Sequence, residues 1–201
     1  MDIKCFLIEK TNDTFRFLRR YASGSECPAE GYSWHDAEIP IEDGIGDADQ
    51  TRGGADDILL IKELKDQFPE KCKCGYEFKE TDIWQIFRER KYRDERGNFY
   101  TLNNAQVGAI WRATWYEDMP SMCGLDGKAY MVKTPGGDWH IDGQASNCTK
   151  PEDNVHKCWC RHGEAPNFTV DKNGNTCNAG GGSILKGNYH GFLRNGYLIN
   201  C

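Results

Sequence analysis

The chain has 201 residues, of which 38% are hydrophobic, and its formal net charge is −6. This length suits one domain with elaborations, and the low hydrophobic share indicates that bound metal or partner surface supplements the core. Acidic and basic residues are interspersed even in the basic stretch 88–91. The charge pattern therefore gives no electrostatic case for binding nucleic acid, and we predict no such partner.

We predict neither a membrane span nor a secretion signal. The sequence contains no run of about 18 uninterrupted apolar residues, and residues 1–10 lack the apolar stretch of a signal peptide. We expect a soluble protein of the cytosol, where the ten cysteines serve as metal ligands or buried thiols rather than disulfides. If the protein enters an extracellular particle, oxidation becomes possible, and Cys5, Cys27 and Cys201 are the free cysteines for it.

Residues 1–55 are expected to form an N-terminal hairpin followed by a loop region. Apolar and aromatic residues surround Asn12-Asp13 within 2–21, a pattern typical of two strands joined by a turn. Residues 23–54 are rich in Gly, Asp, Glu and Pro, so they predict a loop with at most one edge strand at 37–41.

Residues 56–120 are expected to hold the principal helix and a cysteine turn. Acidic residues at 56–57 precede apolar residues at helical spacing, which predicts a helix up to Phe68. In the following Cys72-Lys73-Cys74-Gly75, two thiolates can reach one ion while glycine permits positive φ, as in zinc knuckles. Asp82 predicts a short helix that passes into a strand at 87–93, and the aromatic residues beyond it are expected in the core.

Residues 121–201 predict a cysteine-rich antiparallel β region. Glycine-containing turns follow one another closely, each flanked by β-prone residues. Asn195-Gly196, between Phe192-Leu193 and Tyr197-Leu198, is the strongest hairpin signal in the chain.

The same region contains residues typical of a zinc site. In an extended strand the side chains of His156, Cys158, Cys160 and His162 would project to one face. One strand cannot surround an ion tetrahedrally, so one or two of these residues must join ligands from elsewhere. The Cys72-Cys74 turn supplies the other half of that site or half of a separate one. Our candidate ligands are Cys72, Cys74, Cys148, His156, Cys158, Cys177 and His190, and the expected cofactor is zinc.

A catalytic zinc is the alternative to a structural one. It would need three protein ligands, a water and a nearby acid or base. His140 and Asp142, together with His162, could form such a hydrolase site. We name no catalytic residue, because nothing near them completes a distinctive motif.

The stretches 138–143, 146–149, 156–159, 161–163, 170–174, 176–180 and 189–193, with the Cys72–Tyr76 turn and 15–20, extend over nearly the whole chain. Together they resemble an uncharacterised protein family of tailed bacteriophages. The resemblance implies a phage protein made in the cytoplasm of a bacterial host. It also favours Cys158 over Cys160 as a ligand, because position 160 is often apolar in the family.

The sequence as a whole predicts a single compact α+β protein over 1–201, mostly antiparallel β with one principal helix, stapled by zinc. We expect a phage accessory protein of binding or structural type, either a component of the virion or a binder of a host protein. Its partner is thus expected to be a protein, and the zinc-dependent hydrolase is the alternative.

Overall fold

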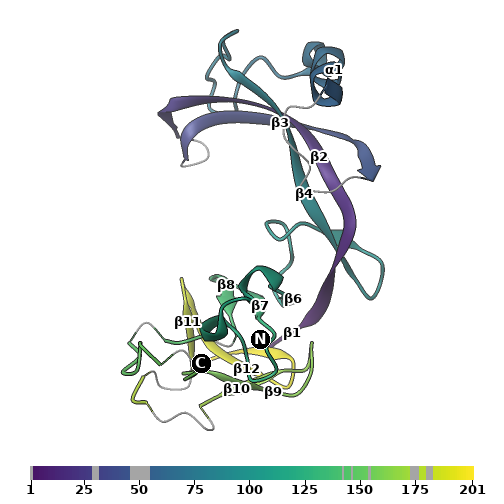
Figure 1. Cartoon of the computed structure of the whole chain (residues 1–201). Helices are drawn as coiled ribbons and strands as arrows, with labels where there is room; N and C mark the ends of the chain where they lie inside the picture. Colours follow the sequence, from purple (N-terminus) through teal and green to yellow (C-terminus); the bar gives the residue numbers. More distant parts are fainter. Residues whose placement is uncertain are drawn as a thin grey trace. The chain divides into compact units, whose positions relative to one another are not determined.

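The computed structural model describes residues 2–28, 32–45, 55–141, 143–145, 147–153, 155–172, 177–179 and 183–201. The chain forms two compact units, unit 1 with residues 1–10 and 92–201 and unit 2 with residues 11–91 (Figure 1). These units cut across the expected segments 1–55, 56–120 and 121–201. The expectation of a single compact protein stays a prediction.

Unit 2 is built on a sheet in which β2 (Phe6–Cys27) lies between β3 (Tyr32–Ile45) and β4 (Ile83–Asp94). The expected hairpin turn at Asn12-Asp13 is wrong, because β2 continues through it and pairs antiparallel with β3. A register shift between Thr14 and Arg16 absorbs the irregularity. Cross-strand pairing here outweighs the local turn preference.

Strand β3 also corrects the expected loop at 23–54. It is much longer than the edge strand expected at 37–41, while residues 29–31 and 46–54 lie outside the described residues. The short helix expected at Asp82 is likewise wrong, since β4 begins at the next residue. The Asp82 carboxylate instead accepts a hydrogen bond of 2.7 Å from the Lys79 N–H, which closes a turn before the strand.

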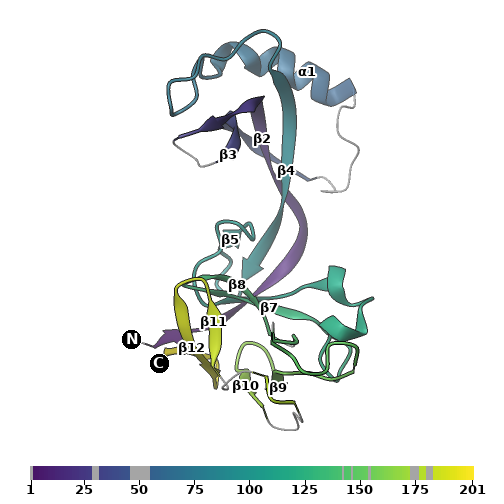
Figure 2. The ribbon, with the colours of Figure 1, turned by 90° about the vertical axis from the view of Figure 1, so that its left-hand side faces the viewer.

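The expected helix is confirmed as α1 (Ala55–Leu64), extended by the 3₁₀ turn η1 (Lys65–Gln67). Figure 2 shows α1 lying across the end of the sheet. Its side chains Leu60, Ile61 and Leu64 pack against a core whose buried residues are Leu18, Phe68 and Ile86, whereas Ile58 and Leu59 are exposed. The Phe68 ring meets the Trp84 ring edge to face, with centroids 4.9 Å apart.

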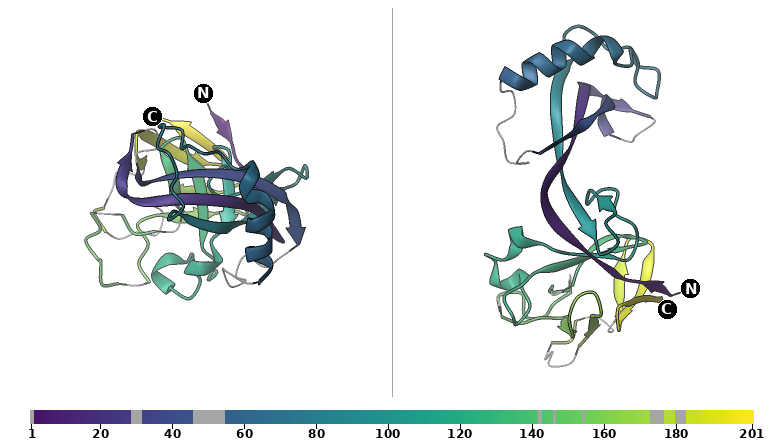
Figure 3. Two further views of the ribbon diagram at one scale, coloured as in Figure 1. Left: turned by 90° about the horizontal axis from the view of Figure 1, so that it is seen from above. Right: turned by 90° about the vertical axis from the view of Figure 1, so that its right-hand side faces the viewer.

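The chain enters unit 2 along β2 and leaves it along β4, and these two strands are neighbours in the sheet (Figure 3). The Thr11 hydroxyl, at the start of the unit, donates a hydrogen bond of 2.9 Å to the Lys91 carbonyl at its end. Unit 2 therefore begins and ends at neighbouring points of one sheet.

Unit 1 consists of short strands. One sheet contains, in order, β1 (Ile3–Lys4), β13 (Tyr197–Asn200), β12 (Tyr189–Arg194) and β11 (Ile184–Lys186). The start of β2 pairs in parallel with β6 (Ala109–Arg112), which continues into β7 (Tyr130–Thr134) and β8 (Gly137–His140). The remaining elements are β5 (Phe99–Tyr100), paired with β4, the pair β9 (Cys160–His162) and β10 (Thr169–Asp171), and the 3₁₀ turns η2 (Thr114–Tyr116) and η3 (Pro120–Met122).

The hairpin expected at Asn195-Gly196 is confirmed, with φ of 47° and 74° at its two central residues. Positive φ at both positions is what a tight two-residue hairpin turn requires. The aromatic stretch divides in two. Tyr92, Tyr100 and Trp111 are buried as expected, whereas Phe99 and Trp115 are exposed.

The expected fold class is confirmed: the described part of the chain is mostly antiparallel β with a single α-helix. The main core of unit 1 has fourteen buried residues, including Cys158, Trp159 and Cys177. No helix in the described ranges has the length and apolar character needed to span a membrane.

Candidate metal centres

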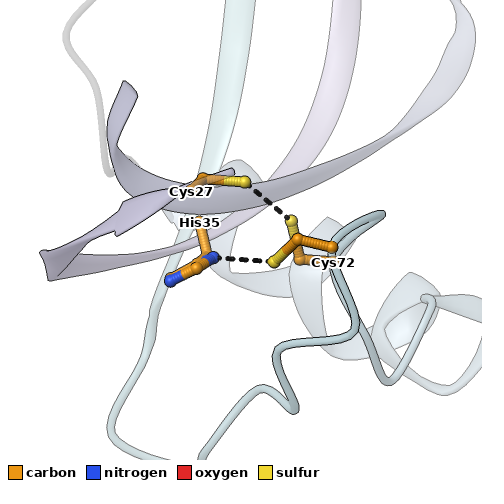
Figure 4. Close-up of side chains that lie close together, drawn as sticks. Cys27, His35 and Cys72 are labelled. Carbon is orange, nitrogen blue, oxygen red and sulfur yellow. Dashed lines mark hydrogen bonds between the residues drawn. The ribbon is translucent and has the colours of Figure 1, made fainter. Parts of the chain in front are cut away.

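Unit 2 brings together three cysteines and one histidine, which we call the first centre: Cys27, His35, Cys72 and Cys74. Cys27 ends β2 and His35 lies on β3, so the β2–β3 hairpin supplies two of the donors. The turn after Phe68 supplies the other two. In Figure 4 the side chains of Cys27, His35 and Cys72 point toward one another.

The spacing of the donor atoms in the first centre suits a tetrahedral ion. All four lie within 4.8 Å of one another, with 3.7 Å between the sulfurs of Cys27 and Cys72. The Nδ1 atom of His35 is 3.1 Å from the Cys74 sulfur. Zinc–sulfur bonds of about 2.3 Å at tetrahedral angles place two sulfurs about 3.8 Å apart. The group is therefore already close to the geometry of a bound zinc ion.

The surroundings of the first centre hold its donors in place. Cys27, His35 and Cys72 are buried, and the His35 ring stacks on Tyr76 at 4.2 Å between centroids. Gly75 has a φ of +92° and its N–H donates to the Cys72 carbonyl, which turns the chain as the sequence predicted. Burial raises the pKa of the Cys72 thiol. A bound cation would offset this effect by stabilising the thiolate.

Unit 1 holds a second group of the same composition, the second centre, formed by Cys148, His156, Cys158 and Cys177. All four donors lie on irregular backbone, and the nearest strand, β9, begins just after Cys158. The Cys158 sulfur is 3.6 Å from that of Cys177 and 3.7 Å from the His156 Nε2 atom. Cys158 and Cys177 belong to the main core, whereas Cys148 and His156 are half-buried.

Backbone N–H groups point at two of the sulfurs in the second centre. The Lys150 N–H donates to Cys148 at 3.3 Å, and the Ala179 N–H donates to Cys177 at 3.4 Å. Burial by itself raises the pKa of Cys177, but hydrogen bonds from Ala179, His156 and Cys158 outweigh it and lower that pKa to about 6. Burial raises the pKa of Cys158 to about 12. Of these two thiols, Cys177 is the one ready to bind a cation as thiolate at neutral pH.

Both centres can bind a metal ion through four protein donors. Three thiols and an imidazole suit zinc, although other thiophilic ions accept the same donors. With four protein ligands on the ion, no coordination position remains for water, which is the arrangement of a structural site rather than a catalytic one.

The structure places six of the seven predicted ligands in these two groups and separates the seventh from them. Cys72 and Cys74 belong to the first centre, and Cys148, His156, Cys158 and Cys177 form the second. His190 belongs to neither group, and its Nε2 atom lies 2.8 Å from the Ser183 hydroxyl.

The expectation that residues 156, 158, 160 and 162 share one face of a strand is wrong. Only Cys160–His162 form a strand, because the chain turns repeatedly before residue 160 to bring His156 and Cys158 to the second centre. His162 pairs instead with Asp171 across β9 and β10, at 2.9 Å.

Two donors of the first centre, Cys27 and His35, are absent from the predicted ligands. Cys27 was predicted to be a free cysteine, and neither residue has a local ligand pattern, since their partners come about forty residues later in the chain. The spacing of these donors could have indicated the site, because His35 follows Cys27 by eight residues, just as His156 follows Cys148.

The two described residues of the alternative hydrolase site, His140 and His162, do not join either centre. His140 is on β8, where burial lowers its pKa and its Nε2 atom has no hydrogen-bond partner among the described residues. Its ring meets Tyr116 edge to face at 5.6 Å. Asp142 lies outside the described residues.

Comparisons of this chain with protein-family models, with curated proteins and with solved structures found no match.

Proposed function

We propose that this chain is a non-enzymatic protein of binding or structural type, whose two units are each stabilised by one structural zinc ion. The observation that supports this most directly is the pair of four-donor groups, one in each unit. Each group is largely enclosed by protein, so an ion there would serve the fold rather than meet a substrate.

The choice of zinc rests on the chemistry of the donors. Thiolate and imidazole are its preferred ligands, and the observed separations match tetrahedral bonding. The position of the first centre supports a structural role, because the ion would join the β2–β3 hairpin to the turn that carries Cys72 and Cys74.

The biological setting that we propose comes from the sequence resemblance. A tailed bacteriophage would encode the protein, and it would be made in the cytoplasm of the bacterial host. There it would act as an accessory protein, bound either in the virion or to a host protein. Mass spectrometry of purified virions separates these two placements, since abundant peptides select the virion.

The metal proposal is tested by elemental analysis of protein purified under reducing conditions in zinc-containing medium. We expect two zinc ions per chain and an X-ray absorption signature of three sulfurs and one nitrogen around each. Replacing Cys27 or Cys158 by serine should remove one ion each. Protein that binds no metal, or whose zinc carries a bound water, would contradict the proposal.

A further inference from the structure

We infer that the outer face of the sheet β1-β13-β12-β11 in unit 1 is a docking surface for an acidic protein segment. This inference rests on the proposed binding function and names the chemistry of the partner. The outer face is defined by six side chains that point away from the main core: Lys4, Leu185, Phe192, Arg194, Tyr197 and Ile199.

The direction of these side chains follows from the alternation along β12 and β13. Tyr189 and Leu193 on β12 and Leu198 on β13 are buried in the main core. Because successive side chains of a strand point to opposite faces, the residues between these three point outward. The inner face of the sheet is therefore part of the core, whereas the outer face meets solvent.

The register of the strands makes the outer face continuous. Tyr197 on β13 is paired with Lys4 on β1 and with Arg194 on β12. In the next row Ile199 on β13 is paired with Phe192 on β12. Directly opposed residues have Cβ atoms about 5 Å apart, and residues two apart in one strand are separated by about 7 Å. The five side chains therefore adjoin one another.

Apolar side chains of the outer face are open to solvent. Tyr197 is 40% exposed and Leu185 is 75% exposed. Leu185 is paired with His190, which is two residues before Phe192 and on the same face of β12. Phe192 and Ile199 are half-buried, and neither belongs to the main core. A partner that covers these side chains would remove apolar surface from water, which favours binding.

The charges of the outer face select an acidic partner. The four strands contain no aspartate or glutamate, although the chain as a whole has a net charge of −6. Lys4 and Arg194 are exposed, and neither forms an ion pair among the described residues. Arg112 and Arg161 of the same unit, in contrast, each pair with a carboxylate. Carboxylates on a partner would supply the counter-charges that the described chain does not place at Lys4 and Arg194.

The guanidinium of Arg194 is already oriented for a carboxylate. Its central carbon lies 4.2 Å from the centre of the Phe192 ring, so the planar group stacks on the ring. A stacked guanidinium keeps the N–H groups along its edge available for two parallel hydrogen bonds to one carboxylate. Because the arginine is held in place before binding, it loses little conformational entropy when the partner arrives.

A protein segment fits this face better than a nucleic acid or a membrane. Nucleic acids present one phosphate per nucleotide, and binding them depends on neutralising several phosphates. Recruitment to anionic lipids takes clusters of about 4–8 Lys or Arg. The outer face offers two such cations beside apolar side chains, in a chain of net negative charge. A partner with a few carboxylates interspersed with apolar residues matches that composition.

The inference is tested with labelled twelve-residue peptides that repeat the sequence X-Ser-Leu-Ser, where X is glutamate, glutamine or lysine. In an extended segment the X and leucine side chains then alternate along one face. Binding to the full zinc-loaded chain is followed by fluorescence anisotropy at about 0.05 M salt, where charges are weakly screened. We expect the glutamate peptide to bind at least about threefold more tightly than the glutamine peptide, and the lysine peptide not to bind.

Variants of the outer face should weaken binding of the glutamate peptide. Arg194→Gln and Tyr197→Ala should each do so by roughly three- to tenfold. Arg194→Lys, which keeps the charge but not the planar fork, should have a smaller effect than Arg194→Gln. Arg93→Gln is the matched control, because Arg93 is an exposed arginine of unit 1 that lies on β4, outside this sheet. It should change the affinity by less than about twofold.

Equal binding of the glutamate and glutamine peptides, or wild-type binding by Arg194→Gln, would overturn the inference. So would Arg194-dependent binding of oligothymidine, or of vesicles of phosphatidylcholine and phosphatidylserine, that is tighter than binding of the glutamate peptide. Self-association of the chain that Arg194→Gln abolishes would overturn it too, because the occupant would then be a second copy. Failure of the metal proposal remains distinguishable, since a chain without zinc that still binds the glutamate peptide through Arg194 would contradict only the proposed zinc.

Discussion

The two centres have the same donors but connect different kinds of structure. The first joins the β2–β3 hairpin to a turn about forty residues later, beside a core whose described buried residues are Leu18, Phe68 and Ile86. The second lies within 148–177 on irregular backbone, and two of its cysteines already belong to a core of fourteen buried residues. A bound ion would thus complete a core in unit 2, whereas in unit 1 it would hold loops against a core that is already present.

Removal of both metal ions should give the largest effect, and the effect should be unequal. Structural zinc contributes about 10–16 kcal/mol of binding free energy in small modules, which is comparable to the whole stability of a domain. With a strong chelator, amide protons of β3 should therefore lose protection from hydrogen exchange, while those of β12 and β13 keep theirs. Equal loss of protection in β3 and in β12 and β13 would show that the two units depend on their ions to the same extent.

Cys27→Ala should remove one zinc ion and unfold unit 2, because the hairpin loses its connection to the Cys72-Cys74 turn. Cys5→Ala is the matched control, since Cys5 is also buried but lies outside both centres. It should cost about 1 kcal/mol and leave the metal content unchanged. Metal analysis and thermal unfolding of the two variants decide the matter, and similar behaviour of both would exclude Cys27 as a ligand.

Cys158→Ala should remove the other ion with a more local result. The neighbouring Trp159 meets Trp139 edge to face at 5.8 Å, so tryptophan fluorescence should report the change. Hydrogen exchange in β3 should remain as in the wild type. If unit 2 unfolds as well, the centres are not independent.

Gly75→Ala should produce a smaller loss at the first centre. A Cβ atom there meets no atom within 4 Å, so the cost is the strain of positive φ, about 1 kcal/mol. Gly127→Ala is the control, since Gly127 has a φ of +73° and the same open space. Both variants should lose similar stability, but only Gly75→Ala should lower the zinc affinity in a competition titration with a chelator.

The smallest effect should come from His140, which neither centre uses. Burial lowers its pKa below the ordinary 6.5, so the unfolded chain binds the proton more readily than the folded one. The stability that depends on neutral His140 is therefore present above pH 6.5 and declines as the pH falls below it. His140→Gln should weaken this decline without loss of zinc, measured by denaturant unfolding at several pH values. A variant that loses metal would place His140 in a centre.

Local patterns predicted much of the fold. The apolar spacing of α1 and the Asn195-Gly196 turn involve neighbours in sequence, and both were found. The continuous β2 was missed because Asn12-Asp13 has the composition of a turn, and only pairing with β3 keeps it extended. Strand pairing depends on residues far away in the chain, which periodicity does not reveal.

The metal ligands likewise include some that local sequence patterns predict and some that they do not. Cys148, His156, Cys158 and Cys177 are close in sequence and were all predicted as ligands, as were Cys72 and Cys74, but the sequence did not separate them into two groups or exclude His190. Cys27 and His35 were missed because the hairpin that carries them was not predicted.

The hydrogen bond between Thr11 and Lys91 has a consequence for the ancestry of the chain. Since unit 2 starts and ends at adjacent positions, its sequence has the form of an insert within the sequence of unit 1. Such an insert can be gained, lost or exchanged among related genes without rerouting the chain on either side. We therefore expect that unit 1 still folds and keeps one metal ion when residues 11–91 are deleted and a two-residue turn joins Lys10 to Tyr92.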